Sequence, residues 1–272
     1  MRRILLHIIL SQLISVYSKA QSIYAPIGGR IIAMGDASAT LAGFWSGFHN
    51  TAGISNLESL SAGVAYENHY GMEGFNFLAA GVSGPIPFGH AFIGAFRFGD
   101  HLYNEHKISL GYANEIGIIQ LGGRINYLQY QVQDFGTKST YSIDFGGITY
   151  LTPQLVVGAQ ALNISQSTLS EEDEQTVPSI LKLGISYRPK KYFMLNLEAE
   201  KDIEKQTILK AGAEYIFLEK FFLRSGIQSS SFQTFYGLGF KYLSLQWDYA
   251  LSNHPELGFS HAISMQYLLR KK

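Results

Sequence analysis

The chain lacks cysteine and is poor in charged residues, and each shortage excludes a class of protein. With no Cys among its 272 residues, it has no disulfide, no thiol chemistry and no cysteine to carry the acyl chain of a lipoprotein. Charged residues make up 15% of the chain, below the roughly 25% usual for soluble domains. The formal net charge is +0, so nothing indicates binding to nucleic acid.

Long apolar runs are also missing beyond residue 20, so the sequence predicts no transmembrane helix there. Aromatic residues and glycine are abundant instead, with 17 Tyr, 18 Phe and 28 Gly. This composition is typical of short strands that have one face in lipid, aromatic side chains at the membrane interfaces and tight turns.

The first twenty residues have the organisation of a secretory signal peptide. Two arginines precede the apolar stretch 4–16, and the small-x-small sequence at 18–20 is a cleavage site that would leave Gln21 as the first mature residue. A membrane-anchor helix is the alternative. It is disfavoured because polar residues interrupt the apolar stretch, which is too short to cross about 30 Å of hydrocarbon. We therefore predict a cleaved signal peptide over 1–20.

The rest of the chain divides into segments of about ten residues in which apolar side chains alternate with small or polar ones. Leu181, Leu183 and Ile185, for example, alternate with lysine, glycine and serine. The pattern predicts about fourteen antiparallel strands. Their ranges are 59–67, 75–84, 88–98, 105–114, 116–131, 138–150, 154–163, 178–188, 192–201, 206–217, 220–229, 232–241, 243–251 and 258–269.

Two further features of these segments favour a closed transmembrane barrel. Six of the seven prolines fall outside the predicted strands and Pro178 opens one, as expected because proline cannot donate to a strand ladder. If the first strand runs outward, all the periplasmic turns are short, and the longest loop, 165–177 with its acidic run 171–174, is external.

A soluble β-sandwich or secreted adhesin is the alternative, but its polar face should look solvated. One feature counts slightly against the barrel, since the chain ends on basic residues, not an aromatic one.

The predicted organisation is therefore a signal peptide over 1–20, a short N-terminal plug or hatch over 21–58, and an all-β barrel over 59–272. The barrel would lie in the outer membrane of a diderm bacterium, in contact with its lipid. The segment 21–58 is too apolar to be a free tail, and its small residues permit close backbone approach.

Inward-facing positions of the strands carry both signs of charge in equal number. On the predicted register the lumen residues are Arg124, Lys182, Lys210, Arg224, Lys241, Asp144, Glu198, Glu200, Glu214 and Asp248. A selective ion pore concentrates one sign at its constriction. The balance favours paired charges that brace a closed or plugged lumen, because an unpaired buried charge is costly.

No arrangement of residues predicts catalysis, a cofactor or a metal. The sequence contains no Gly-x-Ser-x-Gly, no His-Glu-x-x-His and no phosphate-binding glycine loop. His261 and Ser264 are the nearest local pair, but period two places them on opposite faces of a strand. The loop histidines His69, His101 and His254 would need nitrogen atoms within about 2.1 Å of one ion, and solvated loop histidines are commoner.

The opening of the mature chain resembles a known family of barrels. The PorV/PorQ-like barrels, relatives of the FadL long-chain fatty-acid channels, begin with Gly-x-Arg-x-x-x-Met-Gly-x-Ala, and an Asn-Pro-Ala-Gly-like turn follows. The matching residues are Gly28, Arg30, Met34, Gly35, Ala37, Asn50, Ala52 and Gly53. Thr51 departs from the pattern, because the family usually has proline there.

The resemblance implies a fourteen-stranded outer-membrane barrel and leaves two functions open. Close relatives work in type IX secretion and bind cargo or partner proteins, whereas FadL-type relatives pass hydrophobic ligands through a lumen blocked by a hatch. This chain is shorter than most of either group, and we expect little loop mass for a large ligand site. The favoured interpretation is therefore an accessory barrel that binds protein partners, and the alternative is a FadL-like channel for hydrophobic small molecules.

Overall fold

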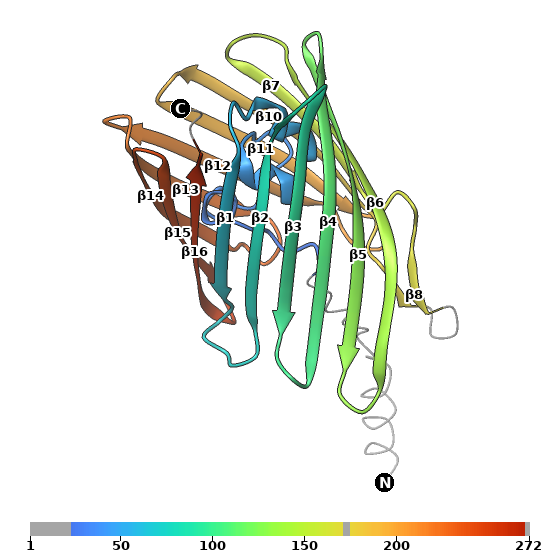
Figure 1. The fold of residues 1–272 in the computed structure, drawn as a ribbon. Helices are drawn as coiled ribbons and strands as arrows, with labels where there is room; N and C mark the ends of the chain where they lie inside the picture. Colours follow the sequence, from blue (N-terminus) through green and yellow to red (C-terminus); the bar gives the residue numbers. More distant parts are fainter. Residues whose placement is uncertain (1–22, 171–174, 270–272) are drawn as a thin grey trace.

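Within residues 23–170 and 175–269, the part of the chain that this computed structural model describes, fourteen antiparallel strands form a closed ring (Figure 1). Strand β1 (Ser61–Asn68) closes the ring by pairing antiparallel with β16 (Gly258–Leu268). Closure leaves no open sheet edge in the wall, which a barrel in lipid requires. The predicted all-β barrel and its strand number are confirmed.

Between β1 and β16, the ring follows the order of the sequence. Its other strands are β2 (Asn76–Ile86), β3 (Gly89–Gly99), β4 (Tyr103–Ile116), β5 (Ile119–Val132), β6 (Gly136–Tyr150), β7 (Leu155–Leu162), β10 (Ile180–Lys190), β11 (Phe193–Asp202), β12 (Ile208–Phe217), β13 (Phe221–Gln228), β14 (Thr234–Tyr242) and β15 (Leu245–His254). Short helical turns precede the barrel: α2 (Gly29–Ala33), η1 (Phe44–Phe48) and η2 (Thr51–Asn56).

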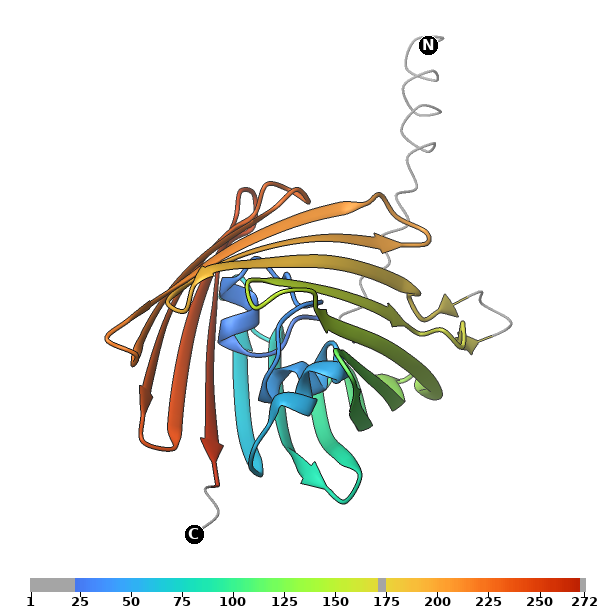
Figure 2. The same ribbon diagram turned by 90° about the horizontal axis from the view of Figure 1, so that it is seen from above.

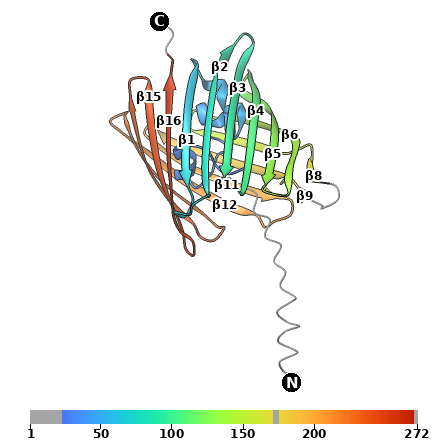
Figure 3. The same ribbon diagram turned by 60° about the horizontal axis from the view of Figure 1, so that its bottom comes forward.

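Three details of the predicted strands need correction. Pro85 and Pro189 lie within β2 and β10, each one residue before the strand ends. A missing N–H matters little at a strand end, and Pro189 falls where the pairing with β11 shifts register between Tyr187 and Lys190. Pro178 precedes β10 instead of opening it. A small hairpin, β8 (Thr168–Ser170) with β9 (Gln175–Thr176), was not predicted; it lies beside β6 (Figure 3).

The outer surface of the ring is apolar. Leu181 and Leu183 are exposed to 54% and 65%, whereas Lys182 between them points inward and is buried. Leucine, isoleucine, tyrosine and phenylalanine occupy outward positions in the same way around the wall. An apolar outer surface of this extent is stable in lipid and unfavourable in water. None of the helices in the described residues is long and apolar enough to cross a membrane.

The two ends of the barrel differ in their connections. At one end, here called the short-turn end, the strands are joined by the turns 87–88, 117–118, 151–154, 191–192, 218–220 and 243–244. At the other, the long-loop end, the connections are 69–75, 100–102, 133–135, 163–179, 203–207, 229–233 and 255–257. The predicted alternation of short turns with longer loops is thus present. That the long-loop end faces the outside of the cell stays a prediction.

Residues 23–58, here called the N-terminal segment, lie inside the ring (Figure 2). The segment starts near the long-loop end, where Ile23 packs against Leu128 and Tyr130. It ends at the short-turn end, where the Asn56 side chain donates to the Tyr150 hydroxyl at 2.7 Å. The polypeptide therefore passes through the interior of the barrel before it enters β1. The predicted signal peptide and its cleavage site lie outside the described residues.

Inward-facing glycines let the wall approach the backbone of the N-terminal segment. An added Cβ at Gly212 would lie 2.5 Å from the Met34 carbonyl oxygen, and one at Gly122 would lie 2.6 Å from the Thr51 carbonyl carbon. Either distance is a steric overlap, so only glycine fits. We call the set of wall positions from β5 to β14 where an added Cβ would lie within 3 Å of the segment the glycine belt: Gly122, Gly146, Gly158, Gly212, Gly226 and Gly237. Because the belt spans β5 to β14, contact with the segment is close over much of the circumference.

Candidate functional site

The first group of inward charges joins β5 and β6 to the N-terminal segment. Arg124 and Asp144 are opposite in register, and Arg124 Nη2 lies 2.5 Å from Asp144 Oδ2. Arg124 Nη1 also donates to the Gly47 carbonyl at 2.7 Å. Asp144 Oδ1 accepts from the Asn163 backbone N–H at 2.8 Å. The pair therefore holds the wall, the segment and the start of the β7–β10 loop together.

The second group spans β10, β11 and β12. The ammonium groups of Lys182 and Lys210 lie 2.9 and 2.7 Å from Glu200 Oε2. Glu198 stands about 4 Å from both, at 4.0 and 3.9 Å, and its Oε2 accepts from the Ala39 backbone N–H at 2.6 Å. Glu198 and Glu200 together therefore neutralise the two lysines, and Glu198 also anchors the N-terminal segment.

The third group contains a residue of the segment itself. Arg224 lies between two carboxylates, at 2.6 Å from both Glu214 and Asp248. Arg30 donates from Nε and Nη2 to the two oxygens of Glu214, both at 2.9 Å. Two-point contact of this kind fixes orientation as well as distance.

The structure thus brings nine of the ten predicted lumen charges into ion pairs, all within the described residues. Lys241 does not join them. It is exposed, one residue before β14 ends, and forms no ion pair in the described part of the chain. The alternation along β14 predicts that its side chain faces inward, but at Lys241 the strand has already reached the short-turn end.

Sequence reasoning missed two buried charges on β4. Tyr103 donates its hydroxyl proton to Glu105 at 2.7 Å, and the Lys107 ammonium donates to the Ile23 carbonyl. Both residues share the alternation of Ser109 and Ala113, which face inward. The predicted strand 105–114 therefore already contained the signal that places them in the lumen.

The residues of the family pattern shape the N-terminal segment. Gly28 and Gly35 have φ of 98° and 68°, where a side chain is strained. Met34 and Ala37 are fully buried. The Ala37 carbonyl accepts from Asn196 Nδ2 at 2.8 Å.

The turn before β1 depends on Asn50. Its Nδ2 donates to the Ala39 carbonyl at 2.6 Å and to the carbonyls of Gly147 and Ala159, both at 3.2 Å. Its Oδ1 accepts from the Ala52 backbone N–H, which caps η2. Ala52 is fully buried, and Gly53 donates to the Asn50 carbonyl at 3.0 Å. One side chain therefore links the segment to β6 and β7.

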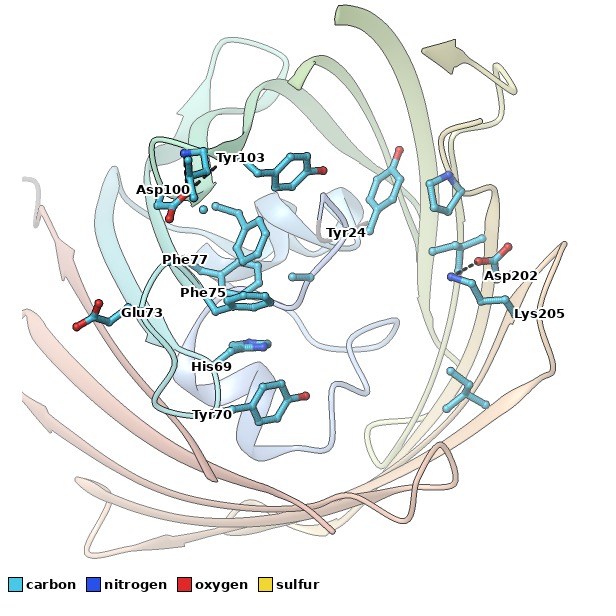
Figure 4. Close-up of a pocket in the computed structure, with 18 of the residues that line it drawn as sticks. Tyr24, His69, Tyr70, Glu73, Phe75, Phe77, Asp100, Tyr103, Asp202 and Lys205 are labelled. Atoms are coloured by element: carbon cyan, nitrogen blue, oxygen red, sulfur yellow. Dashed lines mark hydrogen bonds and ion pairs between the residues drawn. The ribbon is translucent and has the colours of Figure 1, made fainter. Parts of the chain in front are cut away.

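At the long-loop end the interior is hollow. A cavity of about 740 Å³, here called the mouth cavity, lies among the β1–β2, β3–β4 and β11–β12 loops and the start of the segment (Figure 4). Its lining is mainly apolar, with six aromatic side chains: Tyr24, Tyr70, Phe75, Phe77, Phe98 and Tyr103. A polar recess of about 150 Å³ adjoins it and shares Tyr24, Glu200 and Ile208 with it.

The aromatic wall of the mouth cavity comes from the ends of β2 and β3. Phe77 and Phe98 have ring centroids 4.6 Å apart, and Phe75 meets Phe98 edge-on at 5.8 Å. The His69 ring lies 4.4 Å from that of Phe77. Ring pairs at these separations attract each other. These side chains therefore support one another as a continuous apolar wall.

One sequence expectation about this region is wrong. The inner face was expected to be small or polar, but β2 and β3 turn Phe77, Phe96 and Phe98 inward. Little loop mass was expected for a large ligand site, and the room does not depend on it. The room comes from the lumen itself, because the N-terminal segment reaches this level only with its first described residues, Ile23 and Tyr24.

Within the residues that the structure describes, no three His, Asp or Glu side chains are placed to hold a metal ion. His69 Nε2 lies 2.6 Å from Glu67 Oε1, and the ring of His254 is 5.9 Å from that of Tyr70. His261 is exposed on the outer face, whereas Ser264 is buried and accepts from the Gly29 backbone N–H at 2.9 Å. The opposite orientation of His261 and Ser264 is as predicted.

Comparison with known proteins identifies the fold. No protein-family model and no curated protein matches the sequence. Among solved structures, the CymD monoaromatic hydrocarbon channel matches with a TM-score of 0.64 at 12% identity, over 90% of this chain and 98% of that one. The Pseudomonas putida toluene transporter TodX matches with 0.65 at 9%, over 88% and 96%.

A Pseudomonas aeruginosa FadL homologue matches with a TM-score of 0.64 at 10% identity, over 90% of this chain and 99% of that one. At such identities the similarity establishes architecture alone. The chain shares the fold of FadL-like barrels, which points to an outer membrane as its location.

Proposed function

We propose that the chain is an outer-membrane barrel that binds a hydrophobic small molecule in the mouth cavity and admits it to the barrel. The mouth cavity carries this proposal. Its volume of about 740 Å³ lies within the roughly 300–1,000 Å³ usual for small-molecule sites, and such sites are mostly apolar with a few polar groups. Six aromatic side chains supply the apolar surface.

The structural neighbours support the same interpretation. Two of them are described as a monoaromatic hydrocarbon channel and a toluene transporter. Those descriptions belong to the neighbours, and the shared fold is why a hydrophobic ligand is considered first for this chain. The aromatic cavity at the long-loop end is independent support, because it follows from this chain's own residues.

The N-terminal segment would act as the hatch of this channel. Below the mouth cavity the segment fills the lumen, bound by Arg30, Asn50 and the glycine belt. A ligand therefore has no path along the barrel axis while the segment keeps this position. We propose that passage requires a rearrangement of the segment.

A role in type IX secretion, as the PorV/PorQ-like resemblance implied, stays a prediction. Two of the structures reported above are described as a hydrocarbon channel and a toluene transporter. No surface of the described residues points to a particular protein partner. The favoured order of the two functions is therefore the reverse of the one expected from sequence. Export by a cleaved signal peptide also stays a prediction.

Displacement of a fluorescent hydrophobic dye tests the binding. Purified protein in nonionic detergent should bind phenylnaphthylamine, and Phe98→Ala should weaken binding about tenfold because it removes the centre of the aromatic wall. Phe235→Ala is the matched control, since Phe235 is also a buried inward phenylalanine but lies outside the mouth cavity. Equal loss in both variants, or no binding by the wild type, would contradict the proposal.

A further inference from the structure

The charged groups of the mouth cavity are unequal in sign. Among the described residues that line it, four are carboxylates and one is an ammonium group: Glu73, Asp100, Glu200, Asp202 and Lys205. A ligand drawn into the aromatic cavity therefore meets mainly negative charge. The sign of the ligand's own polar group then decides whether it is attracted or repelled.

Two of the four carboxylates are neutralised by lysines. Glu200 at the floor binds both Lys182 and Lys210. Asp202 on the opposite side of the rim pairs with Lys205 at 3.2 Å. These two carboxylates therefore add little net field inside the cavity, and the main selective charge is that of Asp100.

Asp100 has no lysine or arginine partner in the described part of the chain. Its Oδ1 accepts from the backbone N–H groups of Leu102 and Tyr103 at 2.8 and 3.2 Å. Hydrogen bonds from the Tyr103 and Leu102 backbone hold the pKa of this exposed carboxyl below its usual value. Asp100 is thus a negative charge at neutral pH that no neighbouring ammonium or guanidinium cancels.

Glu73 lies on the neighbouring β1–β2 loop, and its carboxylate is directed away from the middle of the cavity (Figure 4). A Cβ added to the adjacent Gly74 would lie 2.8 Å from Asp100 Oδ2, which shows how closely the two loops meet. No ion pair involves Glu73 within the described residues. The rings of Phe75 and Phe98 line the same cavity as Asp100. A carboxylate and aromatic rings in one cavity favour organic cations, because ring faces also attract positive charge.

Lys107 on β4 is shielded from the cavity. Lys107 is 1% exposed, and its Nζ lies 5.4 Å from the centroid of the Tyr24 ring. The ammonium is directed to the Ile23 carbonyl. It is therefore not available to bind a ligand carboxylate.

From these positions we infer that the mouth cavity prefers hydrophobic amines to hydrophobic carboxylates, with uncharged molecules between them. The inference rests on the proposed function, since it concerns the ligand of the same cavity. It separates this chain from a site built for fatty-acid anions. Asp100 provides the main selective charge, and Lys205 opposes it.

Competition among three matched molecules tests this order of preference among amine, uncharged molecule and carboxylate. Phenylbutylamine, phenylbutanol and phenylbutyrate share one apolar part and differ in the charge of the head group. At pH near 7 and low salt, the amine should displace phenylnaphthylamine at a concentration at least about tenfold below that of the carboxylate. The ratio should shrink as salt rises from about 10 mM to about 1 M, where the Debye length falls from about 30 Å to about 3 Å.

Three variants test which residues produce the preference for the amine over the carboxylate. Asp100→Asn keeps the oxygen that accepts the turn's hydrogen bonds and should reduce the preference for the amine severalfold. Lys205→Gln should increase it. Glu115→Gln is the control, because Glu115 is an exposed acid near the short-turn end, and should leave the ratio unchanged.

The outcomes separate the inference from the proposed function. Equal or tighter binding of phenylbutyrate by the wild type would overturn the inference and leave a hydrophobic-ligand channel standing. An unchanged ratio in Asp100→Asn would also overturn it. If none of the three molecules displaces the dye, the proposed function and the inference both fail.

Discussion

The interior of this barrel has two regions that were built by opposite means. From the polar recess to the short-turn end, the lumen is filled by the N-terminal segment, which contacts the wall through backbone, glycine and ion pairs. At the long-loop end the lumen is hollow and lined by aromatic rings. The filled region combines buried ion pairs with an apolar core around Phe44, Trp45 and Phe48 of the segment. The hollow region is lined by aromatic rings and is open to ligand.

The difference shows how one small barrel can close its lumen and still keep a binding site. Buried charges in the filled region are acceptable because each has a partner of opposite sign or a backbone group. The side chains of these ion pairs also form hydrogen bonds with buried backbone groups of the N-terminal segment, which would otherwise lack partners. The cavity has one such group of ion pairs at its floor, Glu200 with Lys182 and Lys210, and its other charges lie at the rim. The predictions below test the filled region first.

The largest effect is expected from Arg224→Ala. This change leaves two buried carboxylates, Glu214 and Asp248, without the guanidinium between them. Loss of one partner of a buried pair costs about 3–5 kcal/mol in the free energy of unfolding. Denaturant unfolding in detergent, followed by tryptophan fluorescence, measures it. Lys241→Ala is the control and should change the free energy by less than about 0.5 kcal/mol, because Lys241 forms no ion pair in the described residues. Similar losses in both variants would show that the ion pairs are not what holds the filled region.

An intermediate effect is expected from Gly122→Ala in the glycine belt. Its new methyl group would overlap the backbone at Thr51 and Ala52, which should cost about 1–3 kcal/mol. The neighbouring Gly123→Ala is the control, since a Cβ there meets nothing closer than 3.8 Å. Limited proteolysis should cut the N-terminal segment faster in Gly122→Ala alone. If the protease cuts the two variants equally, close approach of the segment to the wall is not required to hold the segment in the lumen.

The smallest effect is expected where the chain departs from the PorV/PorQ-like sequence pattern. Thr51 is the first residue of η2, and Asn50 before it has φ −77° and ψ 95°, an extended conformation that tolerates a following proline. Thr51→Pro should therefore raise the free energy of unfolding by about 0.4–1 kcal/mol through the unfolded state. A loss of stability in the same unfolding assay would mean that the turn needs the threonine.

The fold could be predicted because the sequence alternates with period two and its apolar face points to lipid. In β10 this pattern is unambiguous, since Leu181 and Leu183 alternate with Lys182 and Gly184. The same alternation placed Arg124, Glu214 and Asp248 in the lumen, and the register then determined which charges meet. Local periodicity was sufficient for these features.

The mouth cavity could not be predicted in this way. In β3 the apolar residues Phe96 and Phe98 face inward, and Arg97 between them faces outward. The rule that apolar side chains face lipid therefore fails there. Nor does sequence show how far the N-terminal segment extends along the lumen, and this distance determines the volume left empty. The pairing of Arg30 with Glu214 was missed for the same reason.

The most direct test of the account is to lock the N-terminal segment to the wall. The chain contains no cysteine, and a Cβ at Gly184 would lie 3.1 Å from the Ala39 Cβ, close to the roughly 3.5–4.5 Å of a disulfide. The double variant Ala39→Cys with Gly184→Cys should, when oxidised, still bind the dye in the mouth cavity. Cells carrying it should lose uptake of a dye that the intact outer membrane excludes, and reduction should restore uptake. Undiminished uptake by the oxidised protein would contradict the account.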